Sequence, residues 1–286
     1  MKPPTKTRNK NDSEMEISEL LAGVLVERLG VRGKPDLQSI ADRLGIKIRE
    51  VDSEGFDGAL IRVAGRRGAI IAVKASLQDA TRKRFVIAHE IGHFALPEHE
   101  GTEVEVCSPK TLEMWGEGIP TLELQANEFA TELLLPTKHV RETLAQRFPD
   151  LSAIRRIASE YETSLTTTVR KFLRLTDHAC AMVWSAGGEI VWVERSEAFT
   201  PALRRGKLDP SSRASELFAN AAARQDKPEA ADFEARPSRT WLKTLGADAV
   251  DRILECSVFL PNYGSVLTLL WIEDMGALRI ATDEGA

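Results

Sequence analysis

A short segment with the sequence AHEIGH contains the residues most able to do chemistry. On a helix, His89 and His93 lie four residues apart, so their rings project from one face about a turn from each other. Two imidazoles in this arrangement can bind one metal ion, and Glu90 beside them can act on a water molecule at that ion. The spacing is the HExxH pattern of zinc peptidases, and it predicts a metal-dependent hydrolase.

The residues around this pattern favour a metal site over a structural role. Between Phe85 and Leu96 the only ionisable residues are His89, Glu90 and His93, and apolar residues or glycine surround them on all sides of the helix, which is typical of a buried helix. Burying a carboxylate with two imidazoles is costly unless a cation is bound. The alternative is a pair of hydrogen-bonded core histidines with a coincidental glutamate.

A catalytic zinc site usually has three protein ligands and one open position, so a third ligand must come from elsewhere. His99 and Cys107 are candidates in an acidic segment, from Glu98 to Pro120, that we expect to be a long loop. Loops of this length are often functional lids. Cys107 could instead be a redox-sensitive residue near the metal or an inert loop thiol.

A predicted helix from about Leu122 to Leu135 offers a better third ligand. On a helical wheel, Glu123 and Asn127 share the face that carries the apolar residues, whereas Glu128 and Glu132 fall on the opposite, polar face. We therefore expect Glu123 to complete the metal site. Asn127 could accept the free N–H of a ligand histidine and so fix its tautomer, or it could be an ordinary packing residue.

Two stretches of the chain resemble the ImmA/IrrE family of metallopeptidases. The residues from Arg82 to His93 match R-x-R-F-x-x-A-H-E-x-G-H, and those from Glu123 to Pro136 match E-x-x-A-N-x-F-A-x-E-L-L-x-P. Upstream, Pro35-Asp36-Leu37, Leu44-Gly45-Ile46 and Asp57-Gly58 also look like the family. The resemblance covers residues 35–175 well, and beyond them it is weaker and closest to the longer, IrrE-like members with a GAF-like domain.

The resemblance implies a gluzincin-type fold with His89, His93 and Glu123 as metal ligands and Glu90 as general base. Zn²⁺ is the expected cofactor, although Mn²⁺ or Fe²⁺ could also occupy such a site. The implied substrate is a transcriptional repressor of the XRE helix-turn-helix class, cleaved to release stress-response or mobile-element genes. For the oxyanion of this reaction, His139, Tyr161 and His178 remain open as donors.

The pattern of expected elements indicates an α+β protein. We expect a disordered basic tail at residues 1–14, a zincin-like metallopeptidase domain at 15–136, a helical helix-turn-helix-like module at 137–176 and a GAF-like α/β sensor domain at 177–286. Four tryptophans lie on or near strands of the last part and could line a ligand pocket, although such residues more often pack in a core. They are Trp184, Trp192, Trp241 and Trp271.

The helical module leaves DNA binding open. Within the segment from Ala153 to Leu175, side chains suited to bases and phosphates alternate with ordinary core residues. The first group is Thr166, Thr167, Arg170 and Lys171. The rival function is therefore a non-catalytic regulator that binds DNA or a repressor through residues 137–176 and holds a structural metal. The presence of Glu90 argues against this non-catalytic function, because a structural zinc site needs no buried base.

Composition narrows the classes further. A net charge of −5 excludes a bulk nucleic-acid binder. Three cysteines far apart in the sequence argue against a disulfide framework and favour a reducing compartment. No apolar run approaches the roughly 18 residues that cross a bilayer, so we expect a cytoplasmic protein without a membrane partner. The oligomeric state does not follow from the sequence.

Overall fold

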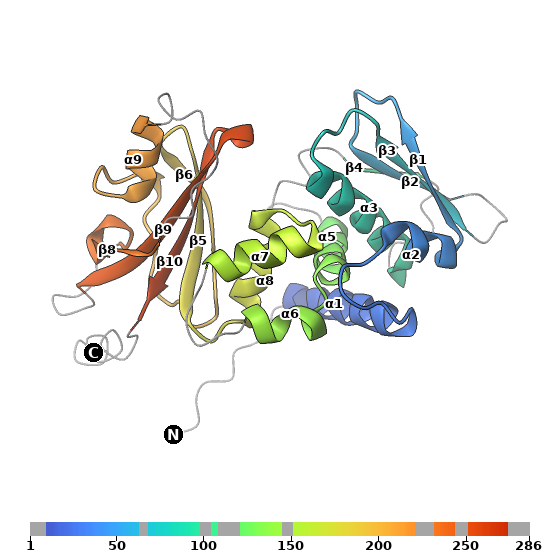
Figure 1. Ribbon diagram of the computed structural model, residues 1–286, viewed down its shortest axis with the longest axis horizontal. Coiled ribbons are helices and arrows are strands. Elements are labelled where there is room, and N and C mark those ends of the chain that lie inside the picture. The colour runs from blue at the N-terminus through green and yellow to red at the C-terminus, as the bar shows by residue number, and fades with distance from the viewer. Residues whose placement is uncertain are drawn as a thin grey trace, which may run out of the picture. The chain divides into compact units, whose positions relative to one another are not determined.

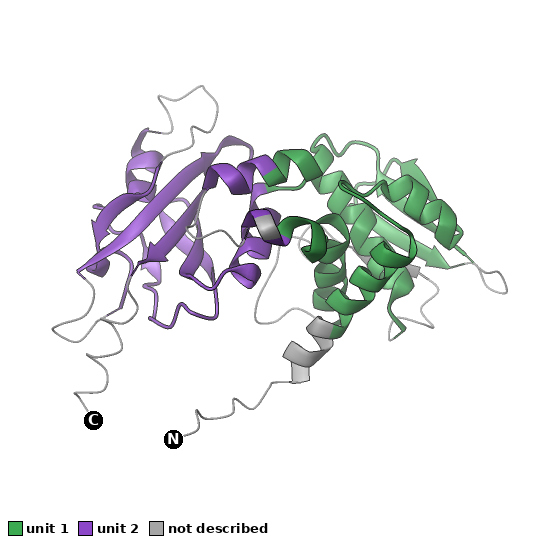
Figure 2. Cartoon of the chain, turned by 60° about the horizontal axis from the view of Figure 1, so that its bottom comes forward, with its two compact units in different colours: residues 1–140, 157–164 green, residues 141–156, 165–286 purple. Residues whose placement is uncertain are grey.

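The computed structural model describes residues 10–62, 68–97, 104–107, 121–144, 151–220, 232–243 and 251–273. Helices and strands occur in mixed order (Figure 1), which confirms the α+β class. The chain forms two compact units (Figure 2): unit 1 comprises residues 1–140 and 157–164, and unit 2 comprises residues 141–156 and 165–286. These units divide the segment 137–176 between them, and the expected helix-turn-helix-like and GAF-like modules stay predictions.

Unit 1 contains a four-stranded sheet in the order β1-β3-β2-β4. β1 runs parallel to β3, and β2 is antiparallel to both β3 and β4. The expectation of a continuous loop from Glu98 to Pro120 is wrong where β4 forms. Residues 98–103 and 108–120 lie outside the described part. The strands are β1 (Ile46–Val51), β2 (Gly58–Arg62), β3 (Ala69–Lys74) and β4 (Val104–Cys107).

Local capping explains where the helices of unit 1 begin and end. The Asp36 side chain accepts hydrogen bonds from two backbone N–H groups at the start of α2, and Gly45 ends it with φ of 76°. Asp79 caps α3 in the same way. α1 begins at Lys10, so the expected tail is wrong for residues 10–14; residues 1–9 lie outside the described part. The helices are α1 (Lys10–Arg28), α2 (Leu37–Leu44), α3 (Ala80–Ala95) and α5 (Thr121–Leu134), followed by α6 (Thr137–Leu144).

The helices of unit 1 stack in layers on the sheet. α3 packs on β2 and β3, α5 packs on α3, and α1 packs on α5. Both α3 and α5 are therefore sandwiched, which explains why they carry buried residues on several faces. Ile91 of α3 and Phe129 of α5 are fully buried in one cluster with Ala22 of α1. This core holds the two central helices firmly together.

Unit 2 contains a six-stranded antiparallel sheet in the order β7-β6-β5-β10-β9-β8. β5 and β6 form one hairpin and β9 and β10 another, and their turns use the positive φ of Gly187, Gly188 and Gly264. The strands are β5 (Ala179–Ala186), β6 (Glu189–Arg195), β7 (Gly206–Lys207), β8 (Glu234–Pro237), β9 (Arg252–Leu260) and β10 (Ser265–Ile272).

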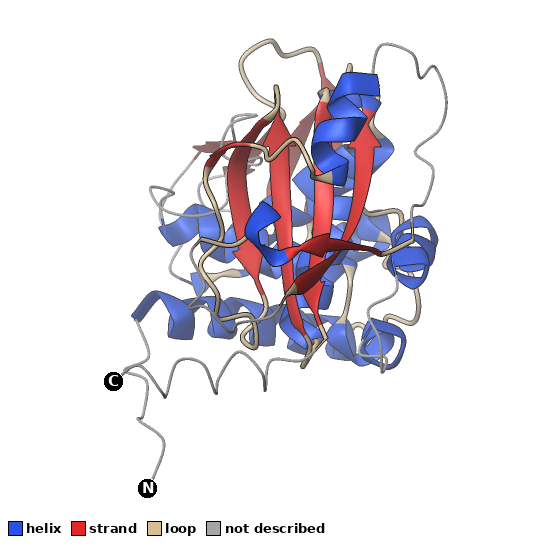
Figure 3. Cartoon of the chain, turned by 90° about the vertical axis from the view of Figure 1, so that its left-hand side faces the viewer, coloured by secondary structure: helices blue, strands red, loops and turns tan. Residues whose placement is uncertain are grey.

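The two faces of this sheet are covered by different helices. α9 (Arg213–Asn220) lies on one face (Figure 3), where Ala181 and Val183 join its cluster. α8 (Leu165–Leu175) contacts β5 and β6, and its Arg170 pairs with Glu194 at 2.8 Å. Because Glu194 lies opposite Met182 in the register, α8 covers the other face. Among the described residues, no helix combines the length and apolarity needed to cross a bilayer.

Burial alters the chemistry of two cysteines in unit 2. Cys180 and Cys256 are buried in the sheet, and removal from water raises the pKa of both thiols, that of Cys256 to about 12. A raised pKa leaves little thiolate at pH 8, so we expect iodoacetamide to alkylate both at least about tenfold more slowly in the folded protein than in urea. Time-resolved mass spectrometry would measure this, and equal rates in the two states would contradict the burial.

Candidate metal centre

The two histidines of the HExxH pattern converge as the spacing predicts. His89 and His93 are buried on α3, and their Nε2 atoms lie 2.9 Å apart. The other ring nitrogen of His89, Nδ1, lies 2.8 Å from Oδ1 of Asn127 on α5. When Nδ1 donates its hydrogen to this oxygen, Nε2 carries the lone pair toward His93. The position of Asn127 Oδ1 therefore suits the His89 tautomer that leaves Nε2 free for a metal ion.

α5 also brings a carboxylate to the same point. Glu123 Oε2 lies 3.3 Å from His89 Nε2, and Oε1 lies 3.6 Å from His93 Nε2. One ligand atom from each of the three side chains falls within a group no wider than 4.8 Å. Two imidazole nitrogens and a carboxylate oxygen are a common donor set for Zn²⁺ in catalytic sites. These three residues could therefore hold one metal ion.

Glu90 lies next to the sheet of unit 1. It is fully buried, and its Oε1 lies close to the backbone of Gly58 at the start of β2. α3 thus presents its histidines to α5 and its glutamate to β2. His89, His93 and Glu123 lie close together, and Glu90 is buried on the same helix as the two histidines.

The close contact of α3 and α5 depends on Gly92. A Cβ atom at this position would lie 3.2 Å from Ala126 O and 3.3 Å from Ala126 Cα. Its third close neighbour would be the Phe129 ring at 3.2 Å. Such distances are tighter than ordinary carbon contacts, so a side chain at position 92 would push the helices apart. The sequence pattern contained this glycine, but only the packing shows why it is needed.

One part of the helical-wheel argument is wrong. Glu128 and Glu132 were expected on a polar face of α5, yet they are only 2% and 5% exposed. Glu132 accepts hydrogen bonds from the backbone N–H and the hydroxyl of Thr137, 2.9 and 2.7 Å away, and so caps α6. The helical-wheel prediction required that one side of α5 faces water, whereas α5 carries buried residues on several sides.

Two arginines that had no predicted role hold α3 in place. Arg62 of β2 donates a hydrogen bond from Nη2 to the backbone oxygen of His93. Arg82 of α3 forms an ion pair with Asp57 at 2.7 Å, and Asp57 is 3% exposed. Arg82 belongs to the family-like motif, which was the signal that could have identified it. Both contacts fix the helix that carries the histidines.

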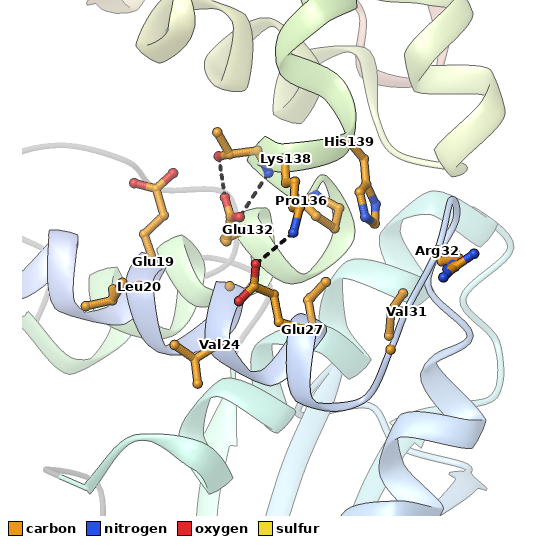
Figure 4. A pocket seen from close by; sticks show the side chains of 14 residues that line it. Glu19, Leu20, Val24, Glu27, Val31, Arg32, Glu132, Pro136, Lys138 and His139 are labelled. Atoms are coloured by element: carbon orange, nitrogen blue, oxygen red, sulfur yellow. Dashed lines mark hydrogen bonds and ion pairs between the residues drawn. The ribbon is translucent and has the colours of Figure 1, made fainter.

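The structure places the remaining candidates less directly. His99 lies outside the described residues, as does the side chain of Cys107. His139 lines a different hollow, a pocket of about 860 Å³ between α1 and the first turn of α6 (Figure 4). Tyr161 is buried near the end of α7 (Leu151–Tyr161). His178 belongs to unit 2, where its ring packs edge-on against Trp271.

The residues suggested for DNA contact are mostly enclosed. Thr167 and Arg170 are 8% and 7% exposed, and Lys171 is fully buried. Arg170 also forms an ion pair with Glu194 of the same unit. As α8 stands in this structure, Thr167, Arg170 and Lys171 are not presented to a nucleic acid.

The tryptophans of unit 2 have packing partners. Trp241 is 1% exposed, and its indole N–H donates a hydrogen bond to the buried carboxylate of Glu255 at 2.9 Å. Trp184 and Trp192 stack with ring centroids 5.8 Å apart. These contacts are those of core and cross-strand residues. The sensing of a small ligand by this unit stays a prediction.

A buried helix with two histidines and a second helix that adds a glutamate form a candidate metal site. Residues 41–173 match the Peptidase_M78 family model, described as the IrrE N-terminal-like domain. This match agrees with the resemblance that the sequence motifs indicated.

Other comparisons add the fold alone. A solved structure named "Mycobacterium tuberculosis transcriptional regulator" is similar with a TM-score of 0.50 and 12% identity, over 92% of this chain and 77% of that chain. At this identity the likeness concerns the arrangement of elements. None of the curated proteins compared matches the chain significantly.

The contact between Asn127 and His89 gives a test by metal binding. Asn127→Ala removes the acceptor that fixes the imidazole tautomer, so we expect zinc affinity to fall by about 10–100-fold. Asn127→Asp keeps an oxygen at this place and should retain more of the affinity than alanine does. Competition with a chromophoric chelator would measure both. Equal affinity in Asn127→Ala and the parent protein would show that Asn127 only packs.

The close approach at Gly92 gives a second test. Gly92→Ala forces α3 and α5 apart, so we expect it to lower the free energy of unfolding by about 1–3 kcal/mol and to weaken zinc binding. Gly23→Ala is the matched control, because its Cβ would meet Glu132 Oε1 at an ordinary 3.7 Å. In the middle of α1 this control should stabilise the protein by about 0.4–1 kcal/mol. Denaturant titration would measure both, and a Gly92→Ala protein as stable as the control would refute the constraint.

Proposed function

We propose that the protein is a zinc-dependent endopeptidase that cleaves a DNA-binding transcriptional repressor of the XRE helix-turn-helix type. Cleavage would derepress stress-response or mobile-element genes. One observation carries the enzymatic part: His89, His93 and Glu123 converge on one point, and Glu90 is buried on the same helix as the histidines. The repressor as substrate rests on the family that residues 41–173 match.

Each residue has a distinct task in this proposal. His89 Nε2, His93 Nε2 and a Glu123 oxygen bind the metal, and Asn127 Oδ1 orients His89. A divalent cation at this place supplies Lewis acidity to water and to the scissile carbonyl. Glu90 acts as general base: one carboxylate oxygen takes a proton from the attacking water and returns it to the leaving amine. Zn²⁺ is the ion we propose, and Mn²⁺ or Fe²⁺ suit the same donors.

A second candidate is a regulator without catalysis, in which the metal only stabilises unit 1. The similar solved structure is named a transcriptional regulator, and this name favours a regulatory role as the second candidate. A regulator that binds DNA through α8 is disfavoured, because Arg170 and Lys171 are buried. The two candidates differ in Glu90, because a purely structural metal would bind and function equally well without it.

We also propose that the protein acts in the cytoplasm. A reducing compartment suits two cysteines that lie buried in the sheet of unit 2 as thiols. The protein repressor that we propose as substrate acts on DNA in the same compartment.

Paired variants of the site test the proposed activity. Glu90→Gln should keep about one zinc per chain and lose cleavage by a factor of at least about 10², because the amide cannot accept the proton. Glu123→Ala should lose both zinc and cleavage, since only two ligands remain. Glu27→Gln is a control at an exposed surface ion pair with Lys138 and should change neither.

Elemental analysis gives the zinc content of these variants. Sequencing of new protein N-termini in cells that express the parent or Glu90→Gln identifies the cleaved substrate. A DNA-binding repressor cut only by the parent protein is the expected result. Cleavage that persists in Glu90→Gln would refute the role of Glu90, and identical sets of N-termini would favour the non-catalytic regulator.

A further inference from the structure

One row of side chains on α3 lies against the start of β2. Arg82, Val86 and Glu90 follow one another at intervals of four residues and so share a helix face. Arg82 Nε and Nη2 lie 2.8 and 2.7 Å from Asp57 Oδ2, and the Asp57 side chain is only 4% exposed. This buried ion pair fixes the helix against the chain directly before Gly58.

Gly58 leaves no room for a side chain at this contact. A Cβ atom there would overlap Val86 Cγ1 and would lie 2.7 Å from Glu90 Oε1. The position is also held from the other side, because Gly58 pairs with Val73 of β3 and Lys74 N donates a hydrogen bond to Asp57 O at 2.9 Å. The strand therefore cannot easily move away from the helix to admit a larger residue.

We propose that Gly58 is a positioning residue of the cleavage reaction, whose bare backbone sets the place of the Glu90 carboxylate. This inference rests on the proposed function. Glutamate is a long side chain with several rotatable bonds, and a misplacement of about 1 Å at a reacting group can reduce the rate by about 10²-fold. The strand limits this freedom, while the Asp57–Arg82 ion pair keeps the strand at the correct distance.

The metal ligands are separate from this contact. His89 and His93 meet Glu123 and Asn127 of α5, whereas Glu90 meets the strand. A methyl group added at position 58 should therefore displace the base and leave the metal ligands in place. This separation distinguishes positioning of Glu90 from a general effect on folding.

The contact itself is tested without any activity, by a double-mutant cycle on the metal-free protein. We expect Gly58→Ala to lower the melting temperature of the transition that zinc shifts, which identifies unit 1. In a protein that carries Glu90→Ala, the decrease in melting temperature caused by Gly58→Ala should be about 2–4 °C smaller. The Glu90 carboxylate is then absent and no longer collides with the new methyl group. If Gly58→Ala does not fold, the cycle of Gly58→Ala and Glu90→Ala is repeated in a protein that also carries Val86→Ala. This third substitution removes the overlap of the new methyl group with Val86 Cγ1.

The effect of Gly58 on catalysis is tested with the substrate that sequencing of the new N-termini identifies. Gly58→Ala should keep the zinc content of the parent and lose at least about tenfold in kcat with KM within about twofold, since a loss confined to kcat marks the chemical step. Gly55→Ala is the matched control, because a Cβ there would meet nothing within 4 Å. The control should cleave as the parent does.

Equal decreases in melting temperature with and without Glu90 would overturn the inference, as would a parent-like kcat in zinc-loaded Gly58→Ala. A loss of zinc together with activity would also overturn it, because the residue would then act through the fold. If the parent protein itself cleaves nothing, the proposed function fails, and the positioning role fails with it even where the cycle shows coupling. Coupling together with a loss in kcat would establish both.

Discussion

The site depends on how closely α3 and α5 can approach each other. His89 and His93 alone supply two donors on one helix face, and Glu123 reaches them only because Gly92 lets the backbone of α5 come within contact distance. Phe129 and Ile91 fill the interface around this point. The packing that stabilises unit 1 is thus the same packing that assembles a three-residue donor group.

The sequence predicted this site better than the surrounding fold. Two histidines at helical spacing and Asp36 or Asp79 before a helix are local signals, so their consequences could be read directly. The order β1-β3-β2-β4 could not, because it depends on pairings between distant segments. The polar reading of Glu128 and Glu132 failed for a similar reason: which faces of α5 are covered is decided by α1 and α3, not by α5 itself.

The faces of α3 have different packing partners. One face carries the histidines to α5, another carries Arg82, Val86 and Glu90 to β2, and Arg62 holds the end of the helix through the backbone oxygen of His93. Such a helix tolerates little change, since each face meets a different partner. Unit 2 has its own antiparallel sheet and its own core, and the candidate metal site lies within unit 1.

X-ray absorption at the zinc edge of the reconstituted protein shows whether His89, His93 and Glu123 together bind one metal ion. We expect only nitrogen and oxygen neighbours of the zinc ion at about 2.0–2.1 Å, with the outer-shell scattering of two imidazoles. A sulfur neighbour at about 2.3 Å would contradict it, because a thiolate such as that of Cys107 would then have taken the place assigned to Glu123.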